Sequence, residues 1–356
     1  MSRPKILYME LLNNNYGNKR LDMEFIKCLC AFADVMVACP KGWFTEIDKR
    51  ARLYEYDQIE VDCSKKNRVI SHLYDLKMGY EKIEIAIELD KKEHFDYLFF
   101  ASFNIVIMRF CYKRFPNYEK RVFITHHDSV DRIQRHNLYK VLFNKYKKKI
   151  NHIVLEKFIK EFLVTGHNID ENKVFMIPHP LNRIKEDVIK EYDMVGISNS
   201  NDESIINSFV EEENSTGFFK DNNLKVMLRS KLQTYDDGYL TVIRGYLEDE
   251  TYYKYVTSAK TLLVPFPLSF QYRMSGTVID AFSNNTKVVG SGIPLLKQYE
   301  KEYPELCCTF DSTNEIFAFL LNDFEGKELI EQFDEFKRVH SNEWIQKCFE
   351  NIFIAE

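Results

Sequence analysis

The feature that most constrains this chain is a recurring order of short apolar strand, polar loop and amphipathic helix. It first appears in residues 5–40. There the run KILYMEL is followed by the loop NNNYGNKR, by apolar residues at helical spacing over 21–33, and by the run DVMVACP. A strand, a crossover helix and a second strand form a βαβ unit, which predicts a parallel sheet. The polar loop then lies at an edge of that sheet.

The same order continues through the first half and begins again in the second. Further strands are predicted at 96–101, 121–127, 153–156 and 173–178, with helical patterns over 71–92 and 130–149. Pro178 and Pro180 interrupt both periodicities, and a second βα series follows, with strands near 193–198, 224–230, 240–246, 261–267, 287–292 and 307–310. We therefore predict an α/β fold of two Rossmann-like domains facing each other across a cleft.

The domain limits follow from that crossing. We predict an N-terminal acceptor domain over residues 1–180, a C-terminal donor domain over 181–335, and a C-terminal helix over 336–356 that packs back on the N-terminal domain. The chain has 356 residues, enough for two cores of ordinary size.

Composition narrows the class of protein. The N-terminal stretch lacks the apolar core of a signal peptide, and the most apolar run, YLFFASFNIVIMRF, is short for a membrane span. The eight cysteines include no CxxC, and no histidine pair has zinc spacing. We expect a cytoplasmic protein with reduced thiols and no metal site.

Charge is divided unevenly along the chain. The net charge is -5, yet the first half is basic and the second half acidic. Lys145, Lys147, Lys148 and Lys149 follow a helical run that contains Tyr139, Phe143 and Tyr146. A basic, aromatic helix of this kind could rest on an anionic membrane surface beside a lipid-linked acceptor. The alternative is a solvated charge run. No nucleic-acid-binding module is present, and we expect no nucleic-acid partner.

Residues 271–292, QYRMSGTVIDAFSNNTKVVGSG, carry the most informative pattern. A helix is predicted to begin near Ser275, directly after the strand and loop TLLVPFP. Ligands of parallel α/β sheets gather beyond the carboxyl ends of the strands. Backbone amides at Ser275, Gly276 and Thr277 would favour a phosphate group, since the helix dipole is positive there. Arg273 could add a bidentate contact, and Asp280 could accept hydrogen bonds from ribose hydroxyls. The alternative is an ordinary helix start with a solvated acid.

The run from Thr261 to Leu296 resembles the donor-binding segment of GT-B glycosyltransferases, especially glycosyltransferase family four and its bacterial surface-polysaccharide relatives. In that family a strand ending in proline leads to an acidic loop, a Gly-led helix that bears an acid followed by Ala, and a "Pro-Val-Val" strand. Asp280-Ala281 matches the Glu-Ala of the helix, and Lys287-Val288-Val289 matches the strand. The resemblance covers about half of the chain and implies a nucleotide-diphosphate sugar as co-substrate, with the ribose at Asp280.

The chain departs from the family at two points. The family's first acid, which contacts the donor sugar, has no counterpart, because Tyr272 stands eight positions before Asp280. The family also places an Arg and a Lys after the first strand of the second domain, where this chain has VGISNSNDES. Arg273, Arg229 or Lys231 would have to replace those bases. Subgroups with Arg-x-Ser-Gly at the helix start favour Arg273.

Two loops of the first domain are the other candidate sites. His126, His127 and Asp128 follow the strand RVFI, and the resemblance places this loop at the reacting centre. A His or Asp there could take the acceptor's hydroxyl proton in an inverting reaction, or orient the sugar in a retaining one. The alternative is a helix start capped by Asp128 or Ser129. Asn15, Tyr16 and Gly17 lie in the loop after the first strand and could approach donor or acceptor.

These observations favour a metal-independent glycosyltransferase that moves a sugar from a nucleotide-diphosphate donor to a glycan or lipid-linked acceptor, in surface polysaccharide or glycoconjugate synthesis. It would need no cofactor. Two alternatives remain open. One is a GT-B-shaped subunit that binds a nucleotide sugar without catalysis, and the other is a sugar-nucleotide epimerase on the same fold.

Overall fold

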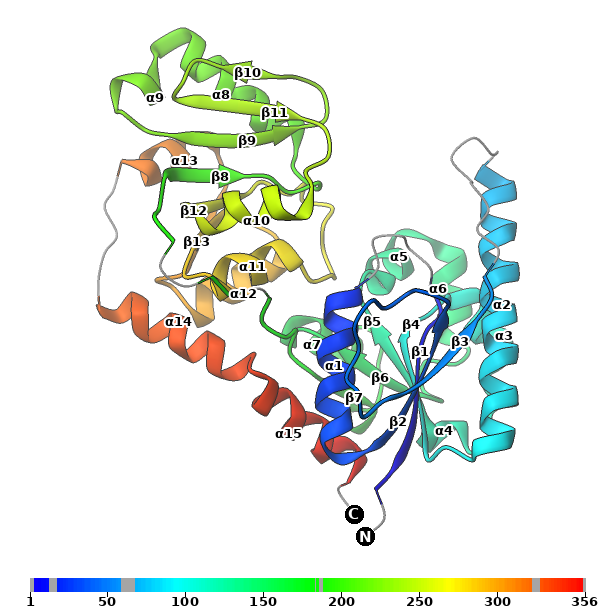
Figure 1. The fold of residues 1–356 in the computed structure, drawn as a ribbon. Coiled ribbons are helices and arrows are strands. Elements are labelled where there is room, and N and C mark those ends of the chain that lie inside the picture. Colours follow the sequence, from blue (N-terminus) through cyan, green and yellow to red (C-terminus); the bar gives the residue numbers. More distant parts are fainter. Residues whose placement is uncertain are drawn as a thin grey trace. The chain divides into compact units, whose positions relative to one another are not determined.

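The computed structural model describes residues 3–12, 18–58, 68–182, 184–185, 188–321 and 327–354. The chain divides into two compact units (Figure 1). Unit 1 comprises residues 1–180 together with 340–356, and unit 2 comprises residues 181–339. Unit 2 is therefore inserted in sequence between two parts of unit 1.

The described part of unit 1 is built around a seven-stranded parallel sheet of order β3-β2-β1-β4-β5-β6-β7. Its strands and helices are β1 (Lys5–Glu10), α1 (Lys19–Phe32), β2 (Asp34–Pro40), β3 (Arg52–Tyr56), α2 (Arg68–Glu93), β4 (Tyr97–Ser102), α3 (Ile105–Cys111), α4 (Tyr118–Arg121), β5 (Val122–His126), α5 (Ser129–Arg135), α6 (Asn137–Asn144), β6 (Asn151–Val154), α7 (Lys157–Thr165), β7 (Val174–Met176) and α15 (Asn342–Phe353).

The core of unit 1 explains why its strands read as continuous apolar runs. All strand residues of β5, and all but the first of β1, β2 and β4, are buried, as expected where helices cover both faces of a parallel sheet. Helix α15 packs against α1 (Figure 1). The ring of Phe349 meets Phe25 of α1 edge-on at 5.1 Å and Phe99 of β4 at 5.9 Å. The last helix thus completes the core of the first unit.

The described part of unit 2 holds a second seven-stranded sheet, of order β10-β11-β9-β8-β12-β13-β14. Its strands and helices are β8 (Tyr192–Gly196), α8 (Glu203–Thr216), α9 (Phe218–Asp221), β9 (Val226–Ser230), β10 (Tyr235–Asp236), β11 (Leu240–Arg244), α10 (Asp249–Thr257), β12 (Ala259–Val264), α11 (Gly276–Ser283), β13 (Lys287–Ser291), α12 (Pro294–Glu302), β14 (Cys307–Phe310), α13 (Thr313–Leu320) and α14 (Lys327–Val339). The pairs are parallel except for β10 with β11, which is antiparallel.

Both sheets contain a switch point. In each, the first strand lies inside the sheet and the strands that follow it extend from one side. A later strand is placed on its other side, the fourth in unit 1 (β4) and the fifth in unit 2 (β12). The order reverses between β1 and β4 in unit 1 and between β8 and β12 in unit 2. Such a switch point opens a crevice at the carboxyl ends of the strands, where ligands of open α/β sheets bind. The predicted fold class of two Rossmann-like α/β domains is confirmed.

One predicted element is wrong. The pattern over residues 130–149 is two helices, α5 and α6, and the basic residues 145–149 form a turn. The break falls at His136, whose backbone is extended. The bend allows Phe143 and Tyr146 to enter the core, where both are completely buried. These two aromatic rings therefore lie in the core of unit 1, away from its surface.

Candidate functional site

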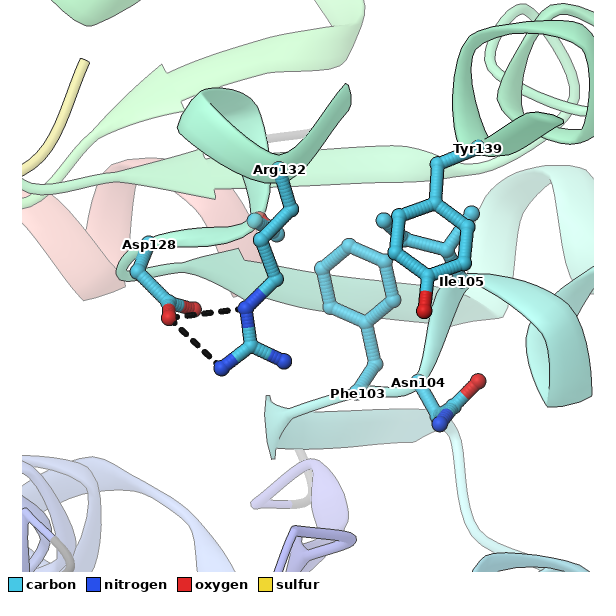
Figure 2. Close-up of a pocket in the computed structure, with 7 residues that line it drawn as sticks. Phe103, Asn104, Ile105, Asp128, Arg132 and Tyr139 are labelled. Carbon is cyan, nitrogen blue, oxygen red and sulfur yellow. Dashed lines mark hydrogen bonds and ion pairs between the residues drawn. The ribbon is translucent and has the colours of Figure 1, made fainter. Parts of the chain in front are cut away.

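The carboxyl ends of β4 and β5 enclose a small pocket in unit 1, beside the switch point (Figure 2). Asp128, Ser129 and Arg132 line it from the end of β5 and from α5. Phe103, Asn104, Ile105 and Tyr139 line it from the end of β4, from α3 and from α6. The pocket thus lies at the carboxyl edge of the sheet, one strand away from the switch point.

Asp128 and Arg132 face each other in this pocket. A carboxylate oxygen of Asp128 lies 2.9 Å from Nε of Arg132, with a second guanidinium nitrogen at 2.7 Å (Figure 2). The two residues are separated by one helical turn, which brings their side chains to the same face of α5. Asp128 precedes the helix without capping it through its side chain. Its charge is therefore balanced within the pocket.

The two histidines of the predicted catalytic loop have different surroundings. His126 is completely inaccessible, and its ring nitrogens lie 2.7 Å from Ser129 Oγ and 2.9 Å from His152 Nδ1. His127 is partly exposed, and its Nε2 lies 2.8 Å from the Ala101 carbonyl oxygen. A carbonyl only accepts, so Nε2 carries the proton and Nδ1 is the basic nitrogen of the neutral His127 ring. Burial lowers the pKa of both rings.

A buried ionisable cluster at the carboxyl end of β1 has no counterpart in the sequence prediction. Glu10, Asp22 and Lys82 are nearly inaccessible. Lys82 Nζ lies 3.2 Å from the Leu11 carbonyl oxygen, and the Tyr8 hydroxyl donates to Asp22 at 2.6 Å. Burial raises the pKa of Asp22 to about 7 and lowers that of Lys82 to about 8. Helical spacing makes Asp22 and Lys82 look like ordinary helix residues, so only the fold reveals that both lie near Glu10. The neighbouring candidates Asn15, Tyr16 and Gly17 lie outside the described residues.

In unit 2, the loop after β12 leads into α11 as predicted from the sequence. Ser275 is the N-cap residue, with an extended backbone and no side-chain cap bond. Gly276 is exposed, and a methyl group placed on it would meet no other atom within 4 Å. The first amides of a helix lack acceptors within the helix. The start of α11 is consequently a place where an anion can approach the backbone.

Arg273 and Tyr272 lie in that loop, and both are half-buried. The Arg273 guanidinium is centred 4.3 Å from the ring of Phe270, a cation–π distance. Phe270 in turn packs on Phe266 at 4.7 Å. This stacking holds the guanidinium near the beginning of α11.

The other two basic candidates, Arg229 and Lys231, have different surroundings. Arg229, at the end of β9, is buried, and its Nε donates to the Gly245 carbonyl oxygen beyond β11. Since β11 and β8 lie on opposite sides of β9, this contact draws the guanidinium to the side away from the switch point. Burial lowers its pKa. Lys231 is exposed, and its backbone amide donates to Glu203 at 2.8 Å.

Asp280 is almost inaccessible and already accepts several hydrogen bonds. Its Oδ1 accepts from Asn182 Nδ2 at 2.6 Å and from the Tyr253 hydroxyl at 3.0 Å. Its Oδ2 accepts from the Tyr252 hydroxyl at 2.9 Å. Thr277 also interacts with Tyr252. The carboxylate therefore ties α11 to α10 and to the segment that enters unit 2. Asn182, Tyr252 and Tyr253 were not predicted, because nothing in their local patterns marks them.

The described residues contain neither a metal-binding cluster nor a membrane-spanning helix. In that part of the chain, no group of three or more His, Cys, Asp or Glu side chains is arranged to hold a metal ion. Nor does any helix found there combine the length and apolar character needed to cross a bilayer.

Comparison with solved structures places this fold among glycosyltransferases. Sucrose-phosphate synthase from Thermosynechococcus elongatus aligns over 99% of this chain and 100% of its own, with a TM-score of 0.66 and 13% identity. A glycosyltransferase from Rickettsia africae aligns over 100% of both chains, with a TM-score of 0.63 and 13% identity. The chain has the GT-B fold.

A third solved structure is Arabidopsis thaliana UGT89C1 complexed with UDP-L-rhamnose. It aligns over 99% of both chains, with a TM-score of 0.63 and 8% identity. No protein-family model matches the chain, and no curated protein sequence does either. The expected resemblance to GT-B proteins is therefore confirmed at the level of the fold.

Proposed function

We propose that the chain is a glycosyltransferase that moves a sugar from a nucleotide-diphosphate donor to a hydroxyl group of a glycan or lipid-linked acceptor. The observation that carries the proposal is the fold, which matches glycosyltransferase structures over essentially the whole of both chains. Two of the solved structures similar to this chain hold UDP-L-rhamnose or UDP.

The donor diphosphate would bind at the start of α11. Gly276 leaves space for a close approach to the backbone, and the positive end of the helix dipole favours an anion. Arg273, held over Phe270, would add a charge-assisted contact to the departing diphosphate. Such contacts strengthen as negative charge develops on the leaving group, which is how they would accelerate transfer.

Asp280 would hold the pentose of the donor. Its carboxylate is oriented by Asn182, Tyr252 and Tyr253, so ribose hydroxyls would compete with these donors for the same oxygens. Tyr272 would face the sugar in place of the acid found in the related family. A hydroxyl there can still donate and accept hydrogen bonds, but it supplies no negative charge.

The acceptor would bind at the unit 1 pocket. His127 offers Nδ1 as a base, since Nε2 is fixed on the Ala101 carbonyl oxygen. Burial lowers the pKa of His127, and the neighbouring Asp128 carboxylate partly offsets this effect. The same carboxylate would stabilise the imidazolium formed on proton transfer. His127 is thus the better candidate for the general base of an inverting reaction. The buried His126 would have a structural role in the same loop.

Nucleotide titration tests the donor site. Isothermal titration of the full chain with UDP, GDP and dTDP should show binding of at least one nucleotide. Gly276→Ala should bind normally, because a methyl group fits there. Gly276→Glu should weaken binding by more than tenfold, since it places a carboxylate against the diphosphate, and the isosteric Gly276→Gln separates charge from size.

The two arginines provide a matched pair in the same titration. Arg273→Ala should lower affinity about tenfold, the value of one charge-assisted hydrogen bond. Arg229→Ala should leave affinity unchanged, because its guanidinium is held near Gly245. Absence of binding for all three nucleotides, or a larger loss in the Arg229 variant, would contradict the proposed donor site.

A second candidate function is a nucleotide-sugar-binding subunit without transferase activity. Two features favour it. Tyr272 replaces the expected acid, and the segment after β8, residues 197–202, contains no basic residue. Donor hydrolysis by the purified chain, lost in Asp280→Ala and Arg273→Ala, would argue against this alternative.

A lipid-linked acceptor would bring unit 1 to a membrane surface. Phe110 of α3 and Leu138 and Val141 of α6 are largely exposed, and these two helices pack together. Lys113, in the turn directly after α3, and Lys140 of α6 are exposed as well. Apolar side chains flanked by cations are typical of contacts with anionic membranes. We infer that this surface meets the membrane during synthesis of surface polysaccharide or glycoconjugate.

A further inference from the structure

A chain of three hydrogen bonds leads from the core of unit 1 to its pocket. His126 and His152 are both completely inaccessible, and His126 Nε2 lies 2.9 Å from His152 Nδ1. His152 Nε2 lies 2.6 Å from the Lys147 carbonyl oxygen, and His126 Nδ1 lies 2.7 Å from Ser129 Oγ. Phe143 packs edge-on against both imidazole rings. Both imidazole rings are therefore shielded from water.

The backbone carbonyl sets the direction of every bond in this chain. The Lys147 oxygen can only accept, so His152 Nε2 carries a proton. Burial lowers the pKa of His152 to about 4, so the ring is neutral near pH 7 and its Nδ1 must accept. His126 Nε2 then donates to it, which leaves His126 Nδ1 as an acceptor. The hydroxyl proton of Ser129 must point inward, at His126.

This direction decides what Ser129 offers to the pocket. With its proton committed to His126, Oγ presents lone pairs to a ligand and can only accept a hydrogen bond. Asn104 instead offers a hydrogen-bond donor. Its Oδ1 accepts from the amides of Val106 and Ile107, which leaves the NH2 group as the donor end of the side chain.

The charges in the pocket cancel. The Asp128 carboxylate and the Arg132 guanidinium are paired at 2.7 and 2.9 Å, and the other lining side chains are neutral at pH 7. Figure 2 shows the Arg132 guanidinium on one side of the Phe103 ring and Tyr139 on the other. The pocket thus offers hydrogen-bonding groups of both kinds without a net charge. Such a lining suits an uncharged polyol better than an anion.

We propose that this pocket binds a neutral, polyhydroxylated acceptor, and that Ser129 orients one of its hydroxyl groups by accepting that group's hydrogen bond. Ser129 is a positioning residue, and His126 and His152 act through it. Only the role of the ligand as an acceptor rests on the proposed transferase function; the preference for a neutral polyol rests on the pocket itself. A hydroxyl whose proton is directed at Ser129 keeps its oxygen lone pairs free for reaction. The inference also excludes an anionic sugar or a phosphate as the group bound at this position.

The direction of the hydrogen bonds can be measured without any activity. In the full chain labelled with ¹⁵N-histidine, NMR should show that His126 and His152 both carry their proton on Nε2 between pH 6 and 8. His126→Gln and His152→Gln assign the signals. A proton on Nδ1 of His126 would overturn the proposal, because Ser129 would then accept from His126 and present its proton to the pocket.

Ligand class is tested with two matched probes, methyl β-D-glucopyranoside and the corresponding methyl glucuronide. Saturation-transfer NMR should detect the neutral glycoside on the full chain, and the uronate should bind more weakly. Ser129→Ala should weaken the neutral probe about fivefold, the value of one hydrogen bond, and Ser129→Thr should restore it. Equal or tighter binding of the uronate would overturn the assignment, as would no response to either probe.

These experiments distinguish failure of this inference from failure of the proposed transferase function. A chain that binds no nucleotide but shows the Nε2 tautomers and prefers the neutral glycoside has a polyol pocket with another purpose. A chain that binds UDP but shows the opposite His126 tautomer retains its proposed function and loses this inference.

Discussion

Both sheets have a switch point beside their first strand, but the edges at which it lies differ in what they expose. In unit 1 three ionisable side chains near that edge, His126, Glu10 and Asp22, are buried. In unit 2 the corresponding edge presents backbone, with Gly276 exposed at the start of α11 and Asp280 held beneath it by three donors. Under the proposed function, one edge would bind hydroxyl groups and the other an anion, although the switch point alone would predict the same use for both.

The largest expected difference between the units is in their response to acid. All nine histidines lie in residues 1–180 and 340–356, and unit 2 has none. Burial lowers the pKa of six of them, namely His126, His127, His152, His167, His179 and His340, with values of about 4 for His152, His167 and His340. The unfolded chain then binds more protons than the folded one below about pH 6.5, so unit 1 loses stability as the pH falls from 6.5 to 4.

A histidine whose folded pKa is about 4 costs about 2 kcal/mol of stability at pH 5. Glu10 and Asp22 act in the opposite direction, because burial raises the pKa of both, but they are two groups against six. Hydrogen exchange followed by mass spectrometry at pH 7 and pH 5, corrected for intrinsic rates, should show loss of protection in unit 1 peptides and little change in unit 2. Equal loss of protection in both units would contradict the predicted difference in acid response.

The next effect concerns Asp280. Asp280→Leu removes the acceptor of three hydrogen bonds, from the half-buried Asn182 and Tyr252 and from the buried Tyr253, and should lower the free energy of unfolding by about 3 kcal/mol. Asp280→Asn, which keeps one acceptor oxygen, should cost less. Urea denaturation monitored by circular dichroism gives both values.

Asp221→Leu is the matched control, since Asp221 is exposed on α9 and should tolerate the change. If the Asp280 variants are as stable as the wild type but bind no nucleotide, the carboxylate serves the ligand alone. Its hydrogen bonds to Asn182, Tyr252 and Tyr253 would then contribute little to the free energy of unfolding.

The smallest expected effect is at the surface of α3 and α6. Leu138→Ser should reduce the fraction of protein that sediments with vesicles of phosphatidylcholine and phosphatidylglycerol about threefold, because one exposed apolar side chain is lost from the contact. Leu232 of unit 2 is equally exposed, at 65%, and Leu232→Ser should have no effect. Binding that is insensitive to Leu138, or as strong to vesicles without anionic lipid, would contradict the membrane contact.

Sequence patterns predicted the sheets well where strands are buried. β4 and β12 read as apolar runs because helices cover both of their faces. The strands that were missed, β3 and β10, lie at sheet edges. Four of the five residues of β3 are exposed, and β10 has only two residues, so neither leaves a hydrophobic pattern. The start of α11 was predictable because Ser-Gly after a proline-ended strand is a local signal.

The partners of the candidate residues could not be predicted in the same way. Successive residues at the end of a strand point to opposite faces, but the sequence does not say which of His126 and His127 points inward. Ser129 looked like a capping residue, and its place against His126 depends on how α5 leaves the sheet. The bonds of Asp280 to Tyr252 and Asn182 join residues far apart in the chain. Only tertiary packing brings them together.

The return of the chain to unit 1 after residue 339 has a consequence for synthesis. The Phe349 and Phe353 rings that pack on the first sheet belong to α15, which is synthesised after the whole of unit 2. Unit 2, whose residues are contiguous, can fold while that helix is still inside the exit tunnel. We therefore expect the N-terminal unit to finish folding after the unit that follows it in sequence, and a premature stop before α15 to damage the domain made first.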